Sequence, residues 1–198
     1  MNRHSAIRKL VAPICTLAHD CRASQVVEFA VTAPLMIVMV IGILDFGSAF
    51  NLKQKLTNAA REAARLGASQ STADLTNATP NSVLAIRDLV SNYLQTARIN
   101  DCGVGTAAAT PVGGSTPWGW TFTGNSCPAG NLVLTVNRGN VFISSVTTGG
   151  NSIKVISTNV SISYPYSWQF NRVIGLIVSG ASYPATNIVV NSTMENQT

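Results

Sequence analysis

The chain has 198 residues and a formal net charge of +5, but only 11% of its residues are charged. A typical soluble domain has about 25%, so the surface relies on Ser, Thr, Asn and Gly. Four of the 13 basic residues precede residue 23, and no dense basic patch interleaved with aromatic residues follows them. This distribution argues against nucleic-acid binding.

A polar, basic leader over residues 1–23 precedes a long apolar run. No charged residue lies between Glu28 and Asp45, and apolar residues continue to Phe50. A helix needs about 20 residues to cross the hydrocarbon core, and acids near the ends of a span cost less than acids at its centre. We therefore predict one transmembrane helix over residues 27–50, in contact with membrane lipid.

A cleaved secretory signal peptide is the alternative interpretation of the apolar run. Its apolar region would have 16 residues, which exceeds the usual 7–15. It also contains Pro34 and ends at Asp45, with no small-x-small cleavage site before Phe50. These features favour a retained span.

The orientation of the span cannot be taken from its flanking charges, because basic residues lie on both sides and the positive-inside rule gives a near tie. The large folded part and a cysteine pair, Cys102 and Cys127, come after the span. Both favour a cytoplasmic N-terminus and an external C-terminal domain. In an oxidising compartment we expect these cysteines to form a disulfide, worth about 3 kcal/mol. A metal site is the weaker alternative, because no His lies after the span.

Helix periodicity continues beyond the span. Apolar or small residues recur at three- and four-residue steps as far as Leu66, and Gly67 suits a helix end. We predict one transmembrane and stalk helix within residues 24–67, followed by a polar linker over residues 68–81 that leads into an extracytoplasmic domain over residues 82–198.

A second helix is predicted over residues 82–98, capped by Asn81 or Ser82. Its apolar residues recur at helical spacing and form one stripe. The stripe consists of Val83, Ile86, Leu89, Val90, Tyr93, Leu94 and Ala97.

Strand patterns begin after Gly130. Segments rich in Val, Ile and Thr with partial alternation indicate strands; they cover residues 132–138, 141–146, 152–166 and 187–194. The sequences RGN and TTGGN between them predict hairpin turns. The apolar segment 169–180 fits a short helix under the sheet or a contact surface. The expected fold class is α+β: a long N-terminal helix, a second helix and an antiparallel sheet of about four strands.

Four motifs follow one another along the first helix. They are VEFA at residues 27–30, Pro34, Asp-Phe-Gly at residues 45–47 and AAREAARLGA at residues 59–68. Their order and spacing resemble the TadE-like proteins of the tight-adherence (Tad, or Flp) pilus system. The Tyr-Pro-Tyr and Met-x-Glu endings of the last strands resemble that family loosely, and residues 70–150 carry none of the resemblance.

The resemblance implies a pseudopilin or minor pilin, made as a precursor in the bacterial inner membrane and trimmed by a prepilin peptidase. The family is cut after a Gly five residues before the Glu. Ala23 holds that position here, so Ser24 would become the new N-terminus. Other pilins, pseudopilins and inner-membrane proteins of the Tad machinery are the implied partners. Because Ala23 departs from Gly, an uncleaved single-pass scaffold of the machine is the alternative.

Glu28 has two interpretations beside this family pattern. In a filament its carboxylate, next to Phe29, would pair with the α-amino group of Ser24 from a neighbouring subunit and set the register between subunits. It is otherwise an interfacial acid favoured by a helix N-terminus.

Other features of the span also have two interpretations. Pro34 kinks the helix or is accommodated by packing. Gly42 and Gly47 permit close helix approach or serve ordinary packing. Asp45 faces a partner helix or lies at the external interface.

The sequence contains no residue pattern typical of a catalytic site. Both His residues lie in the leader, so none can serve a Ser or Cys nucleophile after the span. The acids form no D-x-D cluster, and no glycine loop has phosphate-binding spacing. We expect no enzyme, no catalytic residue, no metal and no cofactor. A third interpretation is an adhesin or ligand-binding module that uses Trp118 and Trp120, within residues 101–130.

Overall fold

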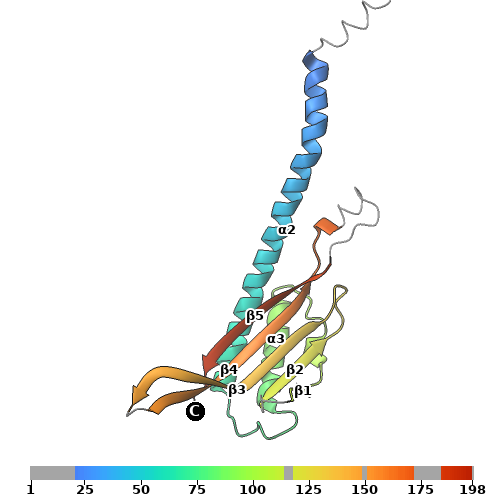
Figure 1. Ribbon diagram of the computed structural model, residues 1–198. Helices are drawn as coiled ribbons and strands as arrows, with labels where there is room; N and C mark the ends of the chain where they lie inside the picture. Colours follow the sequence, from blue (N-terminus) through green and yellow to red (C-terminus); the bar gives the residue numbers. More distant parts are fainter. Residues whose placement is uncertain (1–20, 114–117, 149–150, 172–183, 198) are drawn as a thin grey trace, which may run out of the picture. The chain divides into compact units, whose positions relative to one another are not determined.

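The computed structural model describes residues 21–113, 118–148, 151–171 and 184–197, without the side chains of residues 21–24 and 142–154 (Figure 1). Its helices are α2 (Cys21–Ser69), α3 (Asn81–Thr96) and the short 3-10 helix η1 (Val104–Thr106). Its strands are β1 (Thr110–Pro111), β2 (Gly119–Gly124), β3 (Leu132–Thr148), β4 (Asn151–Tyr166) and β5 (Thr186–Glu195). The predicted α+β class is confirmed, with five strands instead of about four.

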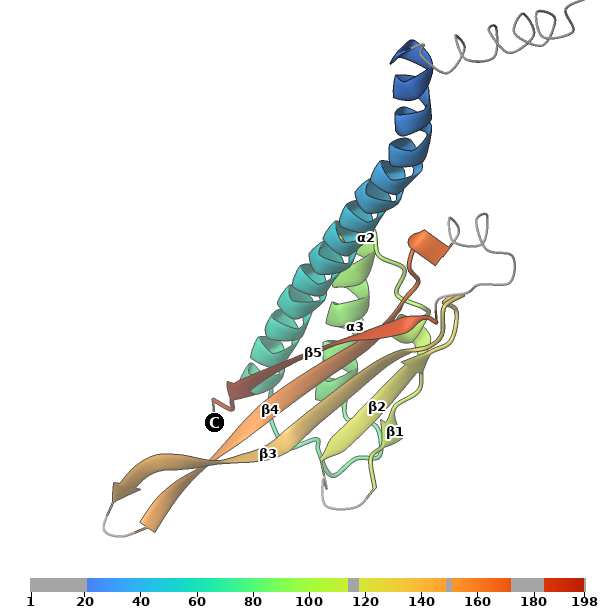
Figure 2. The same cartoon turned by 45° about the horizontal axis from the view of Figure 1, so that its top comes forward.

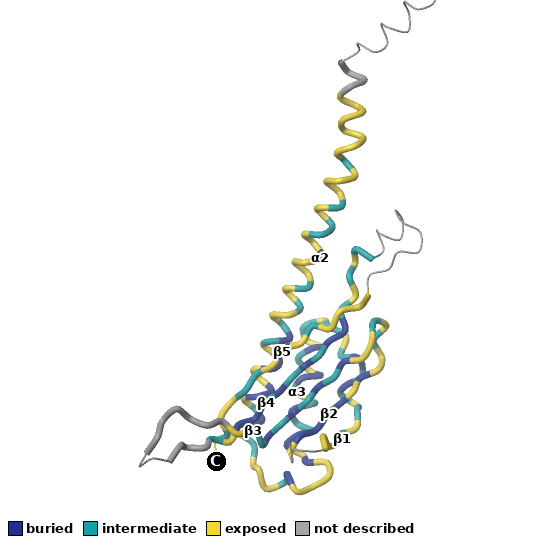
Figure 3. Tube along the Cα trace, in the orientation of Figure 1, coloured by how far each residue is buried: buried dark blue, intermediate teal, exposed yellow. Residues whose placement is uncertain are grey.

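The chain divides into two compact units, Met1–Leu44 and Asp45–Thr198. In the first unit, the described part of α2 is exposed along nearly its whole length (Figure 3). Pro34 lies inside this helix, where it lacks the N–H that would bond to the carbonyl four residues earlier. Residues 1–20 of the predicted leader lie outside the described residues.

The second unit contains one antiparallel sheet whose strands follow chain order, β1-β2-β3-β4-β5. Beyond Asn140, β3 pairs only with β4, and the two strands continue as a ribbon to the Thr148–Asn151 pair (Figure 2). That pairing agrees with the predicted TTGGN hairpin, although residues 149 and 150 lie outside the described residues.

The predicted turn at RGN is wrong. Arg138 to Asn140 lie within β3, where the pairing with β4 shifts register between Asn137 and Asn140. Such a β-bulge bends a strand without ending it. The two predicted strands over residues 132–138 and 141–146 are therefore one.

Strands β1 and β2 lie between the two cysteines, where the sequence suggested only a loop. In β2, Trp120 and Phe122 are buried, and the residues that alternate with them, Thr121 and Thr123, are more exposed. This alternation is that of a strand with one covered face.

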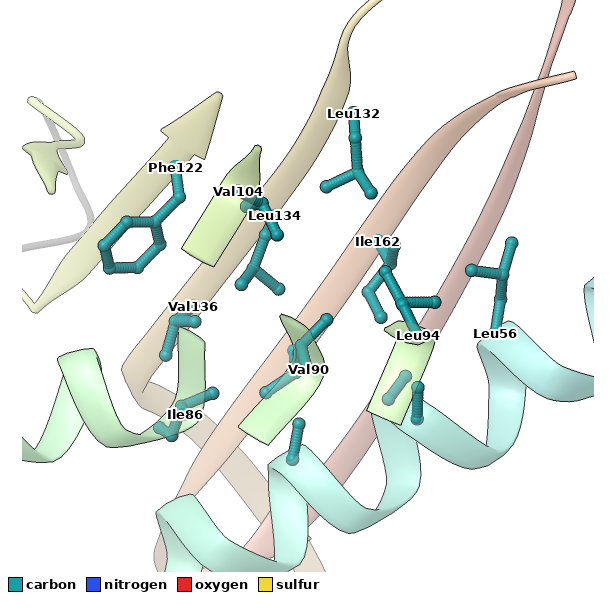
Figure 4. Close-up of a cluster of buried hydrophobic side chains, with 14 of the residues drawn as sticks. Leu56, Ile86, Val90, Leu94, Val104, Phe122, Leu132, Leu134, Val136 and Ile162 are labelled. Carbon is teal, nitrogen blue, oxygen red and sulfur yellow. The ribbon is translucent and has the colours of Figure 1, made fainter. Parts of the chain in front are cut away.

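Helix α3 and the part of α2 after Asp45 cover one face of the sheet (Figure 2). The core between them brings together fully buried apolar side chains (Figure 4). It includes Leu56 from α2, Ile86, Val90 and Leu94 from α3, Val104 from η1, and Phe122, Leu132, Leu134, Val136 and Ile162 from the sheet. Helix α2 otherwise contributes alanines at positions 59, 60, 63 and 64, which leave room for close packing.

Both predicted helix ends need correction. Helix α2 continues past Gly67 to Ser69, and Gly67 serves packing, since a Cβ there would lie 2.7 Å from Thr158 Cγ2. Helix α3 begins after Pro80 without a side-chain cap from Asn81 or Ser82. Instead, the carboxylate of Asp74 in the linker accepts hydrogen bonds from the Ser82 N–H and Oγ, at 2.8 and 2.9 Å.

Candidate functional site

The candidate site begins with the exposed apolar side chains of α2. From Gln25 onward this helix is long and apolar enough to cross a membrane, by length and composition. Large side chains such as Phe29, Leu35 and Ile43 are each at least 65% exposed. Because water disfavours so much contiguous apolar surface, this stretch needs another environment.

Glu28 lies on α2 at the start of this apolar surface. Its side chain is exposed, and among the described residues no group donates a hydrogen bond to its carboxylate. Its backbone carbonyl accepts a second hydrogen bond, from Thr32 Oγ1 at 2.9 Å. Ala23 and Ser24, the predicted processing site, also lie within α2.

Gly42 and Gly47 leave open space beside the helix. A Cβ built on either glycine meets no other heavy atom within 4 Å. Neither glycine is therefore required by packing within the described chain. Small residues at such positions allow a second helix to approach closely.

Asp45 has a partner in its own chain. It is only 3% exposed, and both oxygens of its carboxylate accept hydrogen bonds, one from the last residue of β4 and one from the segment after it. Oδ1 accepts from the Tyr166 hydroxyl at 2.8 Å, and Oδ2 from the Phe170 N–H at 2.9 Å. The sequence did not indicate this role for Asp45.

The environment of Tyr166 changes its acidity. Burial, the hydrogen bond to Asp45 and the negative charge of that carboxylate together raise the pKa of Tyr166 to about 12. Each cause disfavours the phenolate. The hydroxyl therefore remains a donor to Asp45 at any physiological pH.

The predicted disulfide is present and joins Cys102 to Cys127, with 4.8 Å between their Cα atoms. Asp101 shapes the backbone beside it, because its carboxylate accepts hydrogen bonds from Ser91 Oγ at 2.6 Å and the Gly103 N–H at 3.1 Å. The bridge thus fixes the segment after α3 to the connection between β2 and β3.

Arg138 is a buried cation that sequence reasoning missed. It is fully buried, and its two terminal nitrogens donate four hydrogen bonds. Nη2 donates to the carbonyls of Gly67 and Gln70, each at 2.7 Å. Nη1 donates to the Ser71 carbonyl at 3.0 Å and to Ser82 Oγ at 2.7 Å. Arg138 therefore holds the end of α2 and the start of α3 against β3.

Burial lowers the pKa of Arg138, and the negative charge of Asp74 partly opposes that change. Ser82 Oγ lies between the two charged groups, since it donates to Asp74 and accepts from Arg138. The only sign of this site in the sequence is the RGN tripeptide, which has the composition of a turn.

The tryptophans proposed for ligand binding do not form an open pair. Trp120 is 3% exposed and donates from Nε1 to the carbonyl of Ala78 at 3.2 Å. Trp118 is 38% exposed, but its ring lies against Gly139. Within the described residues, no three His, Cys, Asp or Glu side chains gather as metal ligands. The apolar segment 169–180 lies outside the described residues from residue 172 onward.

Comparison with known protein families gives a match that lies in the first long helix, α2. Residues 23–65 match the model of the family described as TadE-like protein. This segment is TadE-like. The TadE-like match contains Glu28, Pro34, Asp45 and both glycines of the exposed surface. Neither a curated protein nor a solved structure matches the chain.

Proposed function

We propose that this chain is a pseudopilin or minor pilin that takes part in assembly of a Tad-type pilus. The observation that carries the proposal is Glu28. It is an exposed carboxylate on a TadE-like helix, and no described group bonds to it. Acids in membrane segments usually pair with another group, and a neighbouring subunit would supply the partner of Glu28.

Processing creates that partner. A prepilin peptidase cuts between Ala23 and Ser24, and Ser24 gains a free α-amino group about one helical turn from Glu28. The amine of one subunit then pairs with the Glu28 carboxylate of the next, with Phe29 beside them. Such a pair sets the register between subunits even where it adds little net stability.

The chain spans the bacterial inner membrane once, with its N-terminus in the cytoplasm and the second unit in the periplasm. The disulfide between Cys102 and Cys127 supports this orientation, because disulfides persist in oxidising compartments. Its partners are membrane lipid, other pilins and pseudopilins, and inner-membrane proteins of the Tad machinery. The TadE-like family is structural rather than catalytic, and the chain acts through assembly without catalysis.

A second candidate is an uncleaved membrane-anchored scaffold of the same machine. One observation favours it: Ala23 occupies the position where the family has Gly. In that case residues 1–23 remain attached, and Glu28 has no amine partner at Ser24.

The test is complementation of a strain that lacks this chain. Glu28→Leu removes the carboxylate and keeps the helix, so we expect loss of pili with normal protein level. Glu62→Leu is the matched control, because Glu62 is also exposed on α2 but lies after the apolar run. Normal pili in cells that carry the Glu28→Leu variant would contradict the assembly role of this acid.

A further inference from the structure

Aromatic side chains gather beside Asp45 in the second unit. The Trp168 ring packs edge-on against Tyr166, with 5.2 Å between ring centroids, and against Phe46, with 5.4 Å. Trp168 donates its indole N–H to Thr186 Oγ1 at 2.9 Å. We call Phe46, Phe50, Tyr166 and Trp168 the aromatic collar.

The Asp45 carboxylate is buried beside the collar, whereas apolar side chains on the same helix stay exposed. Both oxygens of the Asp45 carboxylate accept hydrogen bonds, from Tyr166 at the end of β4 and from the Phe170 N–H after it. By contrast, Phe46 and Phe50 on the same helix are 69% and 63% exposed. Moving a carboxylate without hydrogen-bond partners into an apolar environment costs much free energy. The two hydrogen bonds to Asp45 lower this cost. The apolar surface of α2 therefore continues past Asp45.

The residues after Phe50 have the pattern of a membrane boundary. Lys53 and Lys55 come within five residues of Phe50, and the Lys53 side chain is exposed. Lys55 donates to the Ala97 carbonyl at 3.4 Å, which leaves Lys53 as the lysine that can extend to the lipid headgroups. Trp and Tyr side chains also favour the level of the headgroups, where one end is apolar and the other wet.

We infer that a phospholipid bilayer interface covers the aromatic collar, so that residues 166–170 form a membrane contact in addition to the span. Asp45 is the positioning residue of this contact, because it ties the segment after β4 to α2. This inference rests on the membrane anchoring in the proposed function and requires neither processing nor pilus assembly.

Tryptophan quenching by brominated lipid tests the contact. The full chain is reconstituted in nanodiscs of phosphatidylcholine, with bromine near the headgroup end or near the tail end of the acyl chains. We expect bromine near the headgroup end to quench one of the three tryptophans and tail-end bromine to quench less. Trp168→Phe should abolish this quenching, and Trp118→Phe, the matched control, should keep it.

The opposite results would overturn the inference. They are equal quenching in the wild type and Trp168→Phe, no quenching in the wild type, or quenching of Trp168 by aqueous acrylamide instead of lipid. Asp45→Ala adds a second measurement and should reduce the lipid quenching of Trp168. Because the experiment uses purified chain and lipid alone, loss of this contact and loss of the pilus role are separate outcomes.

Discussion

The Tyr166 hydroxyl donates a 2.8 Å hydrogen bond to Asp45, a residue 121 positions earlier in the chain. The bond ties the end of β4 to α2 directly after the charge-free part of the apolar run. Asp45 belongs to the TadE-like segment and Tyr166 lies outside it. The motif acid is thus held by a part of the chain to which the family match does not extend.

This bond predicts how stability depends on pH. The ordinary pKa of tyrosine is 10.0, and that of Tyr166 is raised to about 12. Folding therefore favours the protonated hydroxyl. The contribution to stability is complete below pH 10 and is lost as the pH rises through 12. Ultraviolet titration of the full chain should show one phenol near pH 12 that Tyr166→Phe removes.

Asp45→Asn is the companion variant for the titration. It removes the negative charge that holds the proton, so the pKa of Tyr166 should fall toward 10. An unchanged titration in this variant would show that Asp45 does not control Tyr166.

Replacing Arg138 should destabilise the second unit strongly. Arg138→Met leaves four acceptors near the end of α2 and the start of α3 without their donor. Unpartnered buried polar groups cost about 1–3 kcal/mol each, and we expect a total loss of about 3 kcal/mol or more. Chemical unfolding in detergent, followed by circular dichroism, measures it.

Arg61→Met is the matched control for Arg138, because Arg61 is exposed on α2. Its effect should stay within about 0.5 kcal/mol. A comparable effect of the two substitutions would contradict the role of Arg138 in holding the helix ends.

Glycines on α2 should differ in their tolerance of a methyl group. In Gly67→Ala the new Cβ meets Thr158 Cγ2 at 2.7 Å and Ile86 Cδ1 at 2.9 Å, and such overpacking costs about 1–3 kcal/mol. Gly42→Ala and Gly47→Ala meet nothing within 4 Å and should not lower the unfolding midpoint. Equal destabilisation by all three would show that the span glycines also pack within the chain.

Removing the disulfide should lower stability without changing the fold. The bridge closes a sequence separation of 25 residues, for which chain entropy gives about 3 kcal/mol. A Cys102→Ser, Cys127→Ser double variant should unfold at lower denaturant and lose the mobility shift that reduction causes on a gel. Identical migration of the reduced and non-reduced wild-type chain would contradict the bridge.

Local patterns in the sequence predicted the elements whose structure depends on local spacing. Val83, Ile86, Val90 and Leu94 have helical spacing, and they are the fully buried apolar residues of α3. The strand over residues 152–166 was likewise predicted from its Val and Ile content, and β4 has nearly the same bounds.

Features that depend on contacts between distant residues could not be predicted from the sequence. The guanidinium of Arg138 bonds to the Gly67 carbonyl, 71 residues earlier in the chain, so the local tripeptide RGN predicted a turn instead of a bulge. Strand β2 was missed because its glycines and threonines have the composition of a loop. Which side of β2 is covered depends on the helices that pack against the sheet and bury Trp120 and Phe122.

The intact mass of the chain, purified from cells with and without the prepilin peptidase, tests the proposed function most directly. We expect a chain that begins at Ser24 when the peptidase is present and a full-length chain when it is absent. Ala23→Gly should be cut in the same way, and Ala23→Arg should not be cut. A full-length mass in both cells would contradict the processed pilin and favour the uncleaved scaffold.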